Sequence, residues 1–495
     1  MHTPEESFPA SLRAAWAELA RRGRVLALAG AALLVLAFAL LPGLAVHSSC
    51  SQGPVEVPCP VDPRDEAGRA VADEFWFAHR GLDGDGTITA RLTELTGTIT
   101  YPPPHHDQIV SGLVPWAKTG LIIKDGLRRG SAYAAIMMTG AHGVRMQHSY
   151  VEDVAGQPGG VSAAQPRWLR LTRSGDVITG YESADGQRWT QVGTARLPGL
   201  PATVQVGLFA ASPGDLTLRE IGLGGHVGES RFTQAVGVFD SVAVDGRAAP
   251  GPWGSDSVGE MNHTDWEKYH RASGLVEAGG TLTVSGTGDI GPVGAEGGQR
   301  VEGTLIGLFA GLIVVIVVAV RFGAAGTRRE LAARSAVLGG AVFAGSLATA
   351  AVALPLGVWL LRRAGVNVLP VGLFTQARVV VGAAAVAALV AVFALALGVL
   401  LRRRWQAVTA GLGIVVLPYL FGVVPYLPDG VSAWLLRVTP AAGFAVLQTV
   451  DEFPQVTAHY APYAGYFPLP GWAGLAVLGA FAGAAYALAA RRTAH

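Results

Sequence analysis

The sequence predicts a membrane protein made of six transmembrane helices and one all-β domain outside the membrane. Three observations support this: six long apolar runs, one long polar insert between the first two runs, and unevenly divided charge. The 495-residue chain has a net charge of +1. Residues 47–303, however, carry 20 Lys and Arg against 29 Asp and Glu, and residues 304–495 carry 13 Arg against 4 acids. The near-neutral total hides an acidic and a basic region, and it offers no single basic patch for nucleic acid.

Six stretches lack every Asp, Glu, Lys and Arg and have about the length of a membrane span. A helix rises ~1.5 Å per residue, so about 20 residues cross a hydrocarbon core of ~30 Å. The six stretches are Val25–Val46, Thr304–Val320, Ser335–Leu361, Val379–Leu401, Trp405–Val424 and Gly471–Ala490. The first could instead be a cleaved signal peptide, but it exceeds the usual apolar length of ~7–15 residues. We therefore predict a retained helix over residues 25–46.

The flanking arginines predict the orientation of these helices. If the N-terminus is cytoplasmic, 13 arginines near the spans lie inside and 4 lie outside. Cytoplasmic loops are enriched in Lys and Arg, so this distribution favours a plasma-membrane protein with both termini, 1–24 and 491–495, in the cytoplasm. Residues 47–303 are then extracytoplasmic.

The stretch 431–450 is a candidate seventh span, but Arg437 and Pro440 interrupt it. An arginine at the bilayer centre costs at least ~2.5–3.5 kcal/mol. A seventh span would also move Arg491 and Arg492 outside. We therefore predict an external re-entrant segment over 431–450, within a helical region 304–490.

The insert has the pattern of an antiparallel β-sandwich. Apolar and polar residues alternate in short runs, and Asp-Gly pairs predict hairpin turns at 85–86, 125–126, 185–186 and 245–246. The clearest hairpin pairs 177–183 with 188–192 around Asp185-Gly186. Cys50 and Cys59 follow the first helix closely, and in an oxidising location we expect a disulfide, the alternative being a reactive thiol pair.

Several segments resemble the concanavalin A-like sandwich of lectins and glucanases. They lie within about 68–245 and include DEFWFAHRGLDGDG (73–86), GLIIKDG (120–126), YAAIMMTGAHGVRMQ (133–147), WLRLTRSGDVITGYESADGQRWTQVG (168–193) and VQVGLFAAS (204–212). Glycosidases of this type need two carboxylates, often as E-x-D-x-x-E on one strand, and that pattern is absent. The resemblance implies a folded spacer or gate, with sugar or cell-wall binding as the alternative.

The sequence predicts no catalytic residue, cofactor or metal site. Residues 112–119 come within one residue of a phosphate-binding loop, G-x-x-x-x-G-K-[ST], but Ala117 replaces the second glycine and no helix pattern follows. The chain also has no LSGGQ-type signature. We therefore expect no ATP hydrolysis by this chain.

Small residues predict where helices approach each other closely. Gly307 and Gly311 are four residues apart, as are Gly479 and Gly483, and this spacing suits close helix packing. The alternative is chance, because the chain has 66 glycines.

The helical region resembles the permease subunits of actinobacterial type-2 ABC exporters, notably in LRRRWQAVTAGLGIVVLPYLFGVV (401–424), WLLRVTPAAGFAVLQTV (434–450) and the stretch 460–492. The resemblance implies a half-transporter in the lipid bilayer that pairs with a second permease subunit and a cytoplasmic ABC ATPase. Arg328, Arg329 and Glu330 would then contact the ATPase, although the stretch 321–334 is shorter than in such permeases. The alternative for these arginines is positive-inside anchoring alone.

The expected function is therefore export of a hydrophobic or amphipathic substrate, because the predicted spans contain no ionisable residue for a proton relay. The alternative is a membrane-anchored, lectin-like cell-wall binding or sensor protein.

Overall fold

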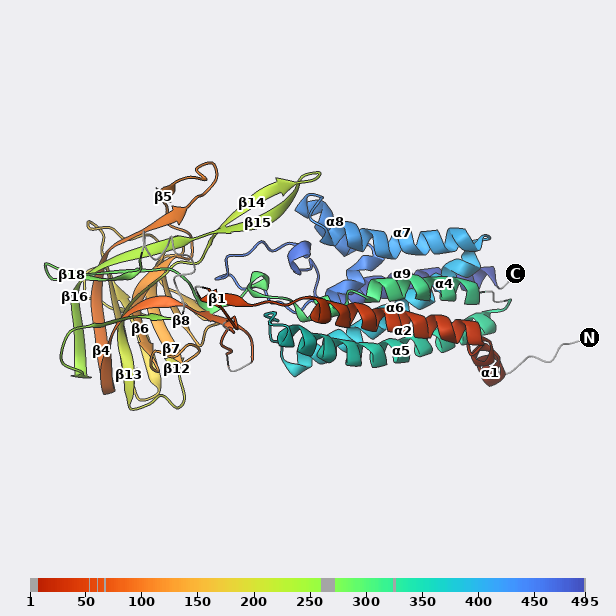
Figure 1. Cartoon of the computed structure of the whole chain (residues 1–495), viewed down its shortest axis with the longest axis horizontal. Coiled ribbons are helices and arrows are strands. Elements are labelled where there is room, and N and C mark those ends of the chain that lie inside the picture. The colour runs from red at the N-terminus through yellow and green to blue at the C-terminus, as the bar shows by residue number, and fades with distance from the viewer. Residues whose placement is uncertain are drawn as a thin grey trace, which may run out of the picture.

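The computed structural model describes residues 8–52, 54–59, 61–65, 68–259, 272–323 and 326–493. The molecule is elongated, with a sheet domain at one end and a bundle of roughly parallel helices at the other (Figure 1). The first described helix and the C-terminus both lie at the end of the bundle that is remote from the sheet domain (Figure 1). We call this the free end and the opposite end the outer end of the bundle.

Among the described residues, six helices are long and apolar enough to cross a membrane, judged by length and composition. They are α2 (Arg22–Ala45), α4 (Leu308–Phe322, continuing the short helix η2, Val301–Leu305), α5 (Arg328–Arg363), α6 (Leu373–Leu400), α7 (Arg404–Val423) and α9 (Gly471–Arg492). The six predicted runs fall on these helices. Both α5 and α6 begin earlier than their runs, because arginine is a good helix former and continues the helix.

The short helix α1 (Phe8–Leu19) precedes the first span and was not predicted. Its side chains Ala15 and Leu19 are buried in the bundle core, whereas Trp16 is 58% exposed. Helix α6 is the most buried of the six, with 67% of an 18-residue apolar stretch inside the molecule, and α2 is the least buried, with 17%. The bundle is therefore built around α6, with α2 at its periphery.

The segment predicted to be re-entrant contains two short helices. Helix α8 (Asp429–Val438) and helix η3 (Pro440–Leu447) meet at an angle of 99°, which is the geometry of a broken span or a re-entrant loop. Every residue of η3 is buried. A further short helix, η4 (Pro462–Ala464), lies between η3 and α9.

The sheet domain contains most of the strands. In chain order they are β3 (Val71–Asp73), β4 (Phe75–Thr100), β5 (Ile109–Ser111), β6 (Lys118–Lys124), β7 (Tyr133–Thr139), β8 (Val144–His148), β9 (Glu152–Ala155), β10 (Arg167–Ser174), β11 (Val177–Ser183), β12 (Thr190–Arg196), β13 (Thr203–Ala211), β14 (Asp215–Ile221), β15 (Gly225–Arg231), β16 (Thr233–Ala248), β17 (Gly254–Val258), β18 (Gly274–Ala278), β19 (Thr281–Gly286) and β20 (Ile290–Pro292). The hairpin of β1 (Cys50–Gln52) and β2 (Val55–Val57) lies before them.

Fourteen of these strands form one sheet that folds into two packed layers sharing the long strand β4, whereas β14-β15 and β3-β20 form separate two-stranded sheets. One layer has the order β12-β11-β10-β4-β16, and the other has the order β4-β13-β6-β7-β8-β9. The layers touch closely: a Cβ added at Gly180 of β11 would lie 2.8 Å from Sδ of Met146 on β8. Fully buried apolar side chains from both layers form one core between them.

The predicted hairpin of β11 and β12 is confirmed, with Asp185-Gly186 in its connection. Two other turn predictions are wrong, because Asp85-Gly86 and Asp245-Gly246 lie inside β4 and β16. There Gly86 pairs with Gly246, and a Cβ at Gly86 would lie 2.5 Å from the carbonyl oxygen of Asp245. These glycines permit two long strands to bend together rather than ending them.

Candidate functional site

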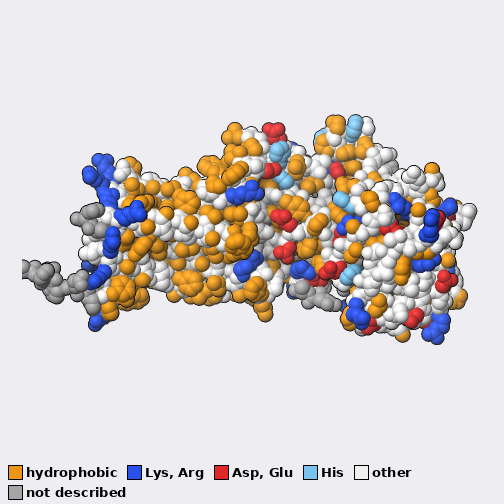
Figure 2. Space-filling view, turned by 180° about the vertical axis from the view of Figure 1, so that it is seen from behind, with side chains coloured by type: hydrophobic (Ala, Val, Ile, Leu, Met, Phe, Trp, Pro, Cys, Tyr) orange, Lys and Arg blue, Asp and Glu red, His pale blue; other side chains and the backbone are white. Residues whose placement is uncertain are grey.

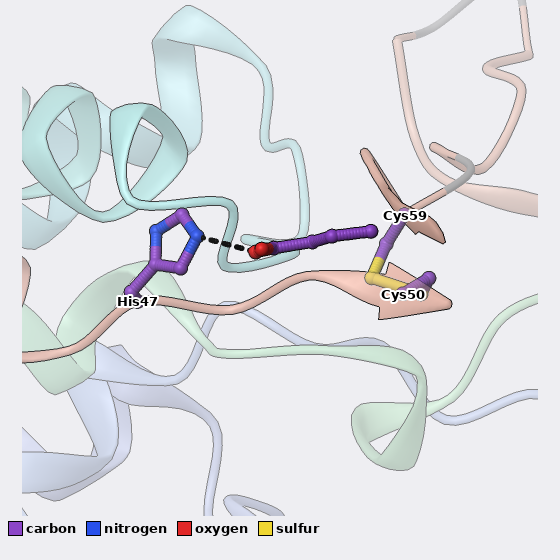
Figure 3. Close-up of a disulfide and its surroundings, with 4 residues drawn as sticks. His47, Cys50 and Cys59 are labelled. Carbon is purple, nitrogen blue, oxygen red and sulfur yellow. Dashed lines mark hydrogen bonds and ion pairs between the residues drawn. A yellow bond between two sulfur atoms is a disulfide. The ribbon is translucent and has the colours of Figure 1, made fainter. Parts of the chain in front are cut away.

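The first connection between the bundle and the sheet domain carries a disulfide. Cys50 and Cys59, the predicted pair, are bonded across the β1-β2 hairpin, with 4.8 Å between their Cα atoms. In Figure 3 the ring of His47 points toward the carboxylate of this hairpin, and His47 Nε2 lies 3.0 Å from Glu56 Oε1. Hydrogen bonds from Ser49 and then His47 lower the pKa of Glu56. The disulfide between Cys50 and Cys59 closes a small loop directly after α2.

Two strands connect the sheet domain to the helices, and two buried lysines hold them. Strand β3 precedes β4 and strand β20 leads toward α4, and the two strands pair antiparallel through Asp73 and Ile290. Lys124 Nζ lies 2.7 Å from Asp73 Oδ2, and Lys118 Nζ lies 2.6 Å from Asp289 Oδ1. Both lysine side chains are fully buried, and both belong to β6. One central strand therefore fixes both connections.

These two lysines have a structural role, because each forms a buried ion pair. Burial lowers the pKa of Lys124, and the neighbouring Asp73 raises it. The hydroxyl of Tyr150 donates a second hydrogen bond to Asp73, at 2.9 Å. Lys118, the lysine of the near-match to a phosphate-binding loop, already has Asp289 as its partner and has no exposed surface. It is therefore not available to a nucleotide phosphate.

A hairpin of the sheet domain reaches the outer end of the bundle. The tip of β14-β15 contacts the connection between α7 and α8, where Leu223 N donates to Tyr426 O at 2.8 Å (Figure 1). Gly228 N donates to the hydroxyl of Tyr463, at 2.9 Å. We call these contacts the junction. These contacts place the sheet domain against the segment that directly precedes α8, where the bent helix pair begins.

Asp429, the first residue of α8, is the charged centre of this junction. Its Oδ2 lies 2.9 Å from His459 Nε2 and 4.0 Å from His226 Nδ1. His226 belongs to β15, whereas His459 precedes η4, so one carboxylate links the sheet domain to two external parts of the bundle. Among the described residues, no three His, Cys, Asp or Glu side chains are placed to hold a metal ion.

A buried carboxylate at the outer end of the bundle escaped the sequence prediction. Glu302 in η2 is 13% exposed, and its carboxylate accepts a hydrogen bond from the hydroxyl of Thr449, which follows η3. Arg300 Nε lies 3.7 Å from the other carboxylate oxygen. The predicted apolar run begins at Thr304, so the acid two residues earlier falls in the predicted insert.

Aromatic side chains fill the space behind Glu302. The ring centroids of Phe309, Tyr419 and Phe444 lie 4.2 to 4.8 Å from one another. They come from α4, α7 and η3, so the bent segment is packed into the bundle by aromatic contacts. Such contacts add stabilisation beyond their buried area.

The three predicted ATPase-contacting residues lie on the first turn of α5, at the free end. Thr327 caps this helix, because its hydroxyl accepts from Glu330 N while Glu330 accepts from Gly326 N. Arg328 Nε donates to Ala490 O of α9, at 2.8 Å. Arg329 is exposed. Glu330 therefore contributes to the cap of α5, and Arg328 connects α5 to α9. Contact of these residues with an ATPase stays a prediction.

The two predicted glycine pairs differ in their surroundings. A Cβ added at Gly307 would lie 2.7 Å from Phe38 Cβ, and one at Gly311 would lie 3.0 Å from Val35 Cγ2, so α4 lies close against α2. Additional Cβ atoms at Gly479 and Gly483 would meet no described atom within 4 Å. The first pair lies at a helix contact within this chain, and the second pair lies on an open face of α9.

The surface of the bundle has the distribution expected of a bilayer protein. Figure 2 shows Lys and Arg gathered at the free end and hydrophobic side chains covering the length from there toward the sheet domain. Exposed tryptophans lie near both ends of the helices: Trp359, Trp434 and Trp472 near the outer end, and Trp16 and Trp405 near the free end. Tryptophan is enriched at the two membrane–water interfaces, and the two groups are consistent with insertion of the bundle in a membrane.

Comparisons with known proteins add little to this description. No family model matches the chain, and no curated protein matches it. A functionally unknown protein from Saccharomyces cerevisiae is 15% identical, over 41% of this chain and 93% of its own, with a TM-score of 0.24. Scytalido-glutamic peptidase with a transition state analog inhibitor is 10% identical, over 44% of this chain and 98% of its own, with a TM-score of 0.25. TM-scores this low do not show a shared fold, so neither likeness indicates a function for this chain.

Proposed function

We propose that this chain is the membrane-spanning permease subunit of an ABC exporter, which moves a hydrophobic or amphipathic substrate with energy from a separate ATPase subunit. The observation that carries the proposal is the bent pair α8–η3. Its backbone turns through 99° and its second half is wholly buried in the bundle. Irregular backbone at membrane depth is tolerated only inside protein or along a cavity, and it is typical of transport proteins.

The number of helices also supports transport over anchoring. A lectin-like sensor needs one span to stay in the membrane, whereas the described part of this chain has six helices of sufficient length. The six predicted apolar runs contain no Asp, Glu, His, Lys or Arg, and the buried Glu302 lies only at the outer end of the bundle. This argues against a proton relay across the membrane and favours an apolar cargo. In this proposal the basic free end faces the cytoplasm, the sheet domain is extracytoplasmic, and a second permease subunit completes the pathway.

We further propose that ATP is hydrolysed by the partner rather than by this chain. The free end presents arginines on the first turn of α5, of which Arg329 is exposed and suited to an acidic surface on the ATPase. The sheet domain then acts through the junction, where it can hold the outer end of α8 in place.

The test is purification of the full chain from its own cells, identification of any ABC ATPase that co-purifies with it, and measurement of ATP hydrolysis in lipid vesicles. We expect a stable complex whose ATPase rate depends on the permease. Arg329→Glu should lower this stimulation, whereas Arg363→Glu, at the outer end of the same helix, should leave it unchanged. A chain that binds no ATPase and changes no ATPase rate would contradict the proposal.

A further inference from the structure

Lysine is rare in this chain, and both lysines that the structure describes are buried. Of the 37 Lys and Arg residues only three are lysines, and Lys268 lies outside the described residues. Lys118 and Lys124 have no exposed side-chain surface. Arginine is always charged, whereas a buried lysine can lose its proton and then act as a nucleophile. The sheet domain therefore holds two amines in its interior, in a chain that otherwise uses arginine for its positive charges.

Lys124 has the partners of a stable ammonium group. Its Nζ donates to Asp73 Oδ2 at 2.7 Å, to Ser131 O at 3.0 Å and to the hydroxyl oxygen of Tyr150 at 3.3 Å. An ammonium group has three hydrogens, so each of them has an acceptor here. Asp73 Oδ2 also accepts from the hydroxyl of Tyr150, which stabilises the carboxylate. We therefore expect Lys124 and Asp73 to remain an ion pair.

Lys118 has fewer acceptors than Lys124. Within the described part of the chain, its Nζ donates to Asp289 Oδ1 at 2.6 Å and to Ile290 O at 3.2 Å. The third hydrogen of a charged Lys118 has no acceptor there, and a buried charged donor without a partner is unfavourable. Transfer of one proton from Nζ to the carboxylate of Asp289 removes both charges and the unsatisfied hydrogen.

The surroundings of this pair favour neutral groups. Side chains alternate along a strand, so Ile122 lies on the same face of β6 as Lys118. Ile122 belongs to a buried apolar cluster that includes Phe209 and Ile290. Charges are costly in such surroundings even when they are paired, whereas a neutral amide avoids that cost. The side chain of Asp289 is 19% exposed, which leaves a way out for a water molecule.

Both side chains are also held in place. Lys118 is the first residue of β6, which pairs with β7 on one side and with β13 on the other. The carbonyl oxygen of Asp289 accepts from Glu74 N at 2.8 Å, and Asp289 Oδ1 accepts from Ile290 N at 2.8 Å. Nζ of Lys118 therefore rests beside Cγ of Asp289, the carbon to which Oδ1 is bonded. Groups held in this way react as if at concentrations of up to ~10⁵–10⁸ M.

We propose that Lys118 and Asp289 condense to an intramolecular amide. A proton moves from Nζ to the carboxylate and rests on Oδ2, which gives an amine and a carboxylic acid. The amine nitrogen attacks Cγ, and the N–H of Ile290 stabilises the negative charge that develops on Oδ1. The bond between Cγ and Oδ2 then breaks, and Oδ2 leaves as water with a second proton from Nζ. The third proton stays on the amide nitrogen, so no other reactant is consumed.

The amide locks the connection between the sheet domain and the bundle. Asp289 directly precedes β20, which leads toward α4, and it is 171 positions from Lys118. A covalent bond across so long a loop constrains the unfolded chain. It also keeps β6 and the start of β20 joined when the surrounding strands open.

The test is the intact mass of the full chain, purified from membranes in detergent and measured after reduction of its disulfide. We expect a mass that is lower than the sequence mass by one water molecule. Digestion should then yield one branched peptide, joined through Lys118 and Asp289 and identified by fragmentation in the mass spectrometer. The full sequence mass, or a water loss located at any other pair of residues, would overturn the proposal.

Two variants supply the matched comparison. Lys118→Arg keeps a positive charge opposite Asp289 but has no amine, so we expect the full sequence mass. It should also migrate more slowly on a denaturing gel, because only the unsubstituted chain keeps a closed loop. The double variant Lys124→Met with Asp73→Leu removes the other buried pair and should keep the water loss. A water loss that persists in Lys118→Arg, or its absence from a double variant whose tryptophan fluorescence shows a folded sheet domain, would overturn the proposal.

Discussion

The sheet domain and the helix bundle hold distant parts of the chain together by opposite chemistry. In the sheet domain, the fully buried Lys124 pairs with Asp73 of β3, and the fully buried Lys118 pairs with Asp289, directly before β20. In the bundle, helices meet where glycine lets backbones approach, as at Gly307 and Gly357. A domain folded in water can bury a charge that has a partner. Helices that lie in hydrocarbon, as we propose for this bundle, gain nothing from apolar burial and rely on close packing.

The largest effect should come from breaking a buried ion pair. Asp73→Ala leaves Lys124 buried without its carboxylate, and the loss of one partner of such a pair costs about 3–5 kcal/mol. We expect this loss in the free energy of unfolding of the sheet domain, measured on the full chain by denaturant titration and tryptophan fluorescence. The double variant Lys124→Met with Asp73→Leu should recover most of it. A loss below about 1 kcal/mol would mean that the lysine does not hold the connection.

The second effect concerns the glycine contacts of the bundle. Gly307→Leu forces a side chain into the contact between α4 and α2, and overpacking of this kind costs about 1–3 kcal/mol. Gly479→Leu adds the same side chain on an open face and should change the stability of the isolated subunit by less than about 0.5 kcal/mol. Unfolding in sodium dodecyl sulfate measures both. Equal losses would show that the glycine contacts do not distinguish the two faces.

A smaller effect is expected at the free end of α5. Thr327→Ala removes the cap of this helix, and the loss of such a cap costs about 0.5–2 kcal/mol. Thr349→Ala serves as the control, because its hydroxyl donates to the carbonyl oxygen of Gly345 in the interior of the helix and caps no helix end. The same unfolding assay compares them. If Thr327→Ala has no larger effect than Thr349→Ala, the capping contacts are not important for stability.

The smallest effect is a pH dependence confined to the sheet domain. Burial lowers the pKa of His148, against the raising effect of Glu152, so the folded domain favours the neutral imidazole. Its contribution to stability is complete above the ordinary pKa of about 6.5 and is lost as the pH falls through the lowered value. His148→Gln should therefore reduce the loss of stability between pH 7.5 and pH 5. If the variant has an unchanged pH profile of stability, His148 does not contribute to the pH dependence.

The helices could be predicted from the sequence because long runs without charge leave few alternatives. The run from Val379 needed no long-range information, whereas α1 was missed because twelve residues around Arg13 have no such signal. The ion pair of Lys118 with Asp289 joins residues that are 171 positions apart, so no local sequence pattern predicts it. Glycine spacing has the same limit as a predictor. Gly307 and Gly479 are each followed by a second glycine four residues later, but only the fold shows that the first pair packs against a helix and the second lies on an open face.

The central claim is that the six helices separate the sheet domain from the arginine-rich free end across a membrane. The most direct measurement is labelling of single cysteines in intact cells with a membrane-impermeant maleimide, in a chain whose Cys50 and Cys59 are replaced by alanine. We predict that Thr190→Cys in the sheet domain reacts in intact cells and that Arg491→Cys reacts only after the membrane is opened. Reaction of both in intact cells, or the reverse order, would contradict the account.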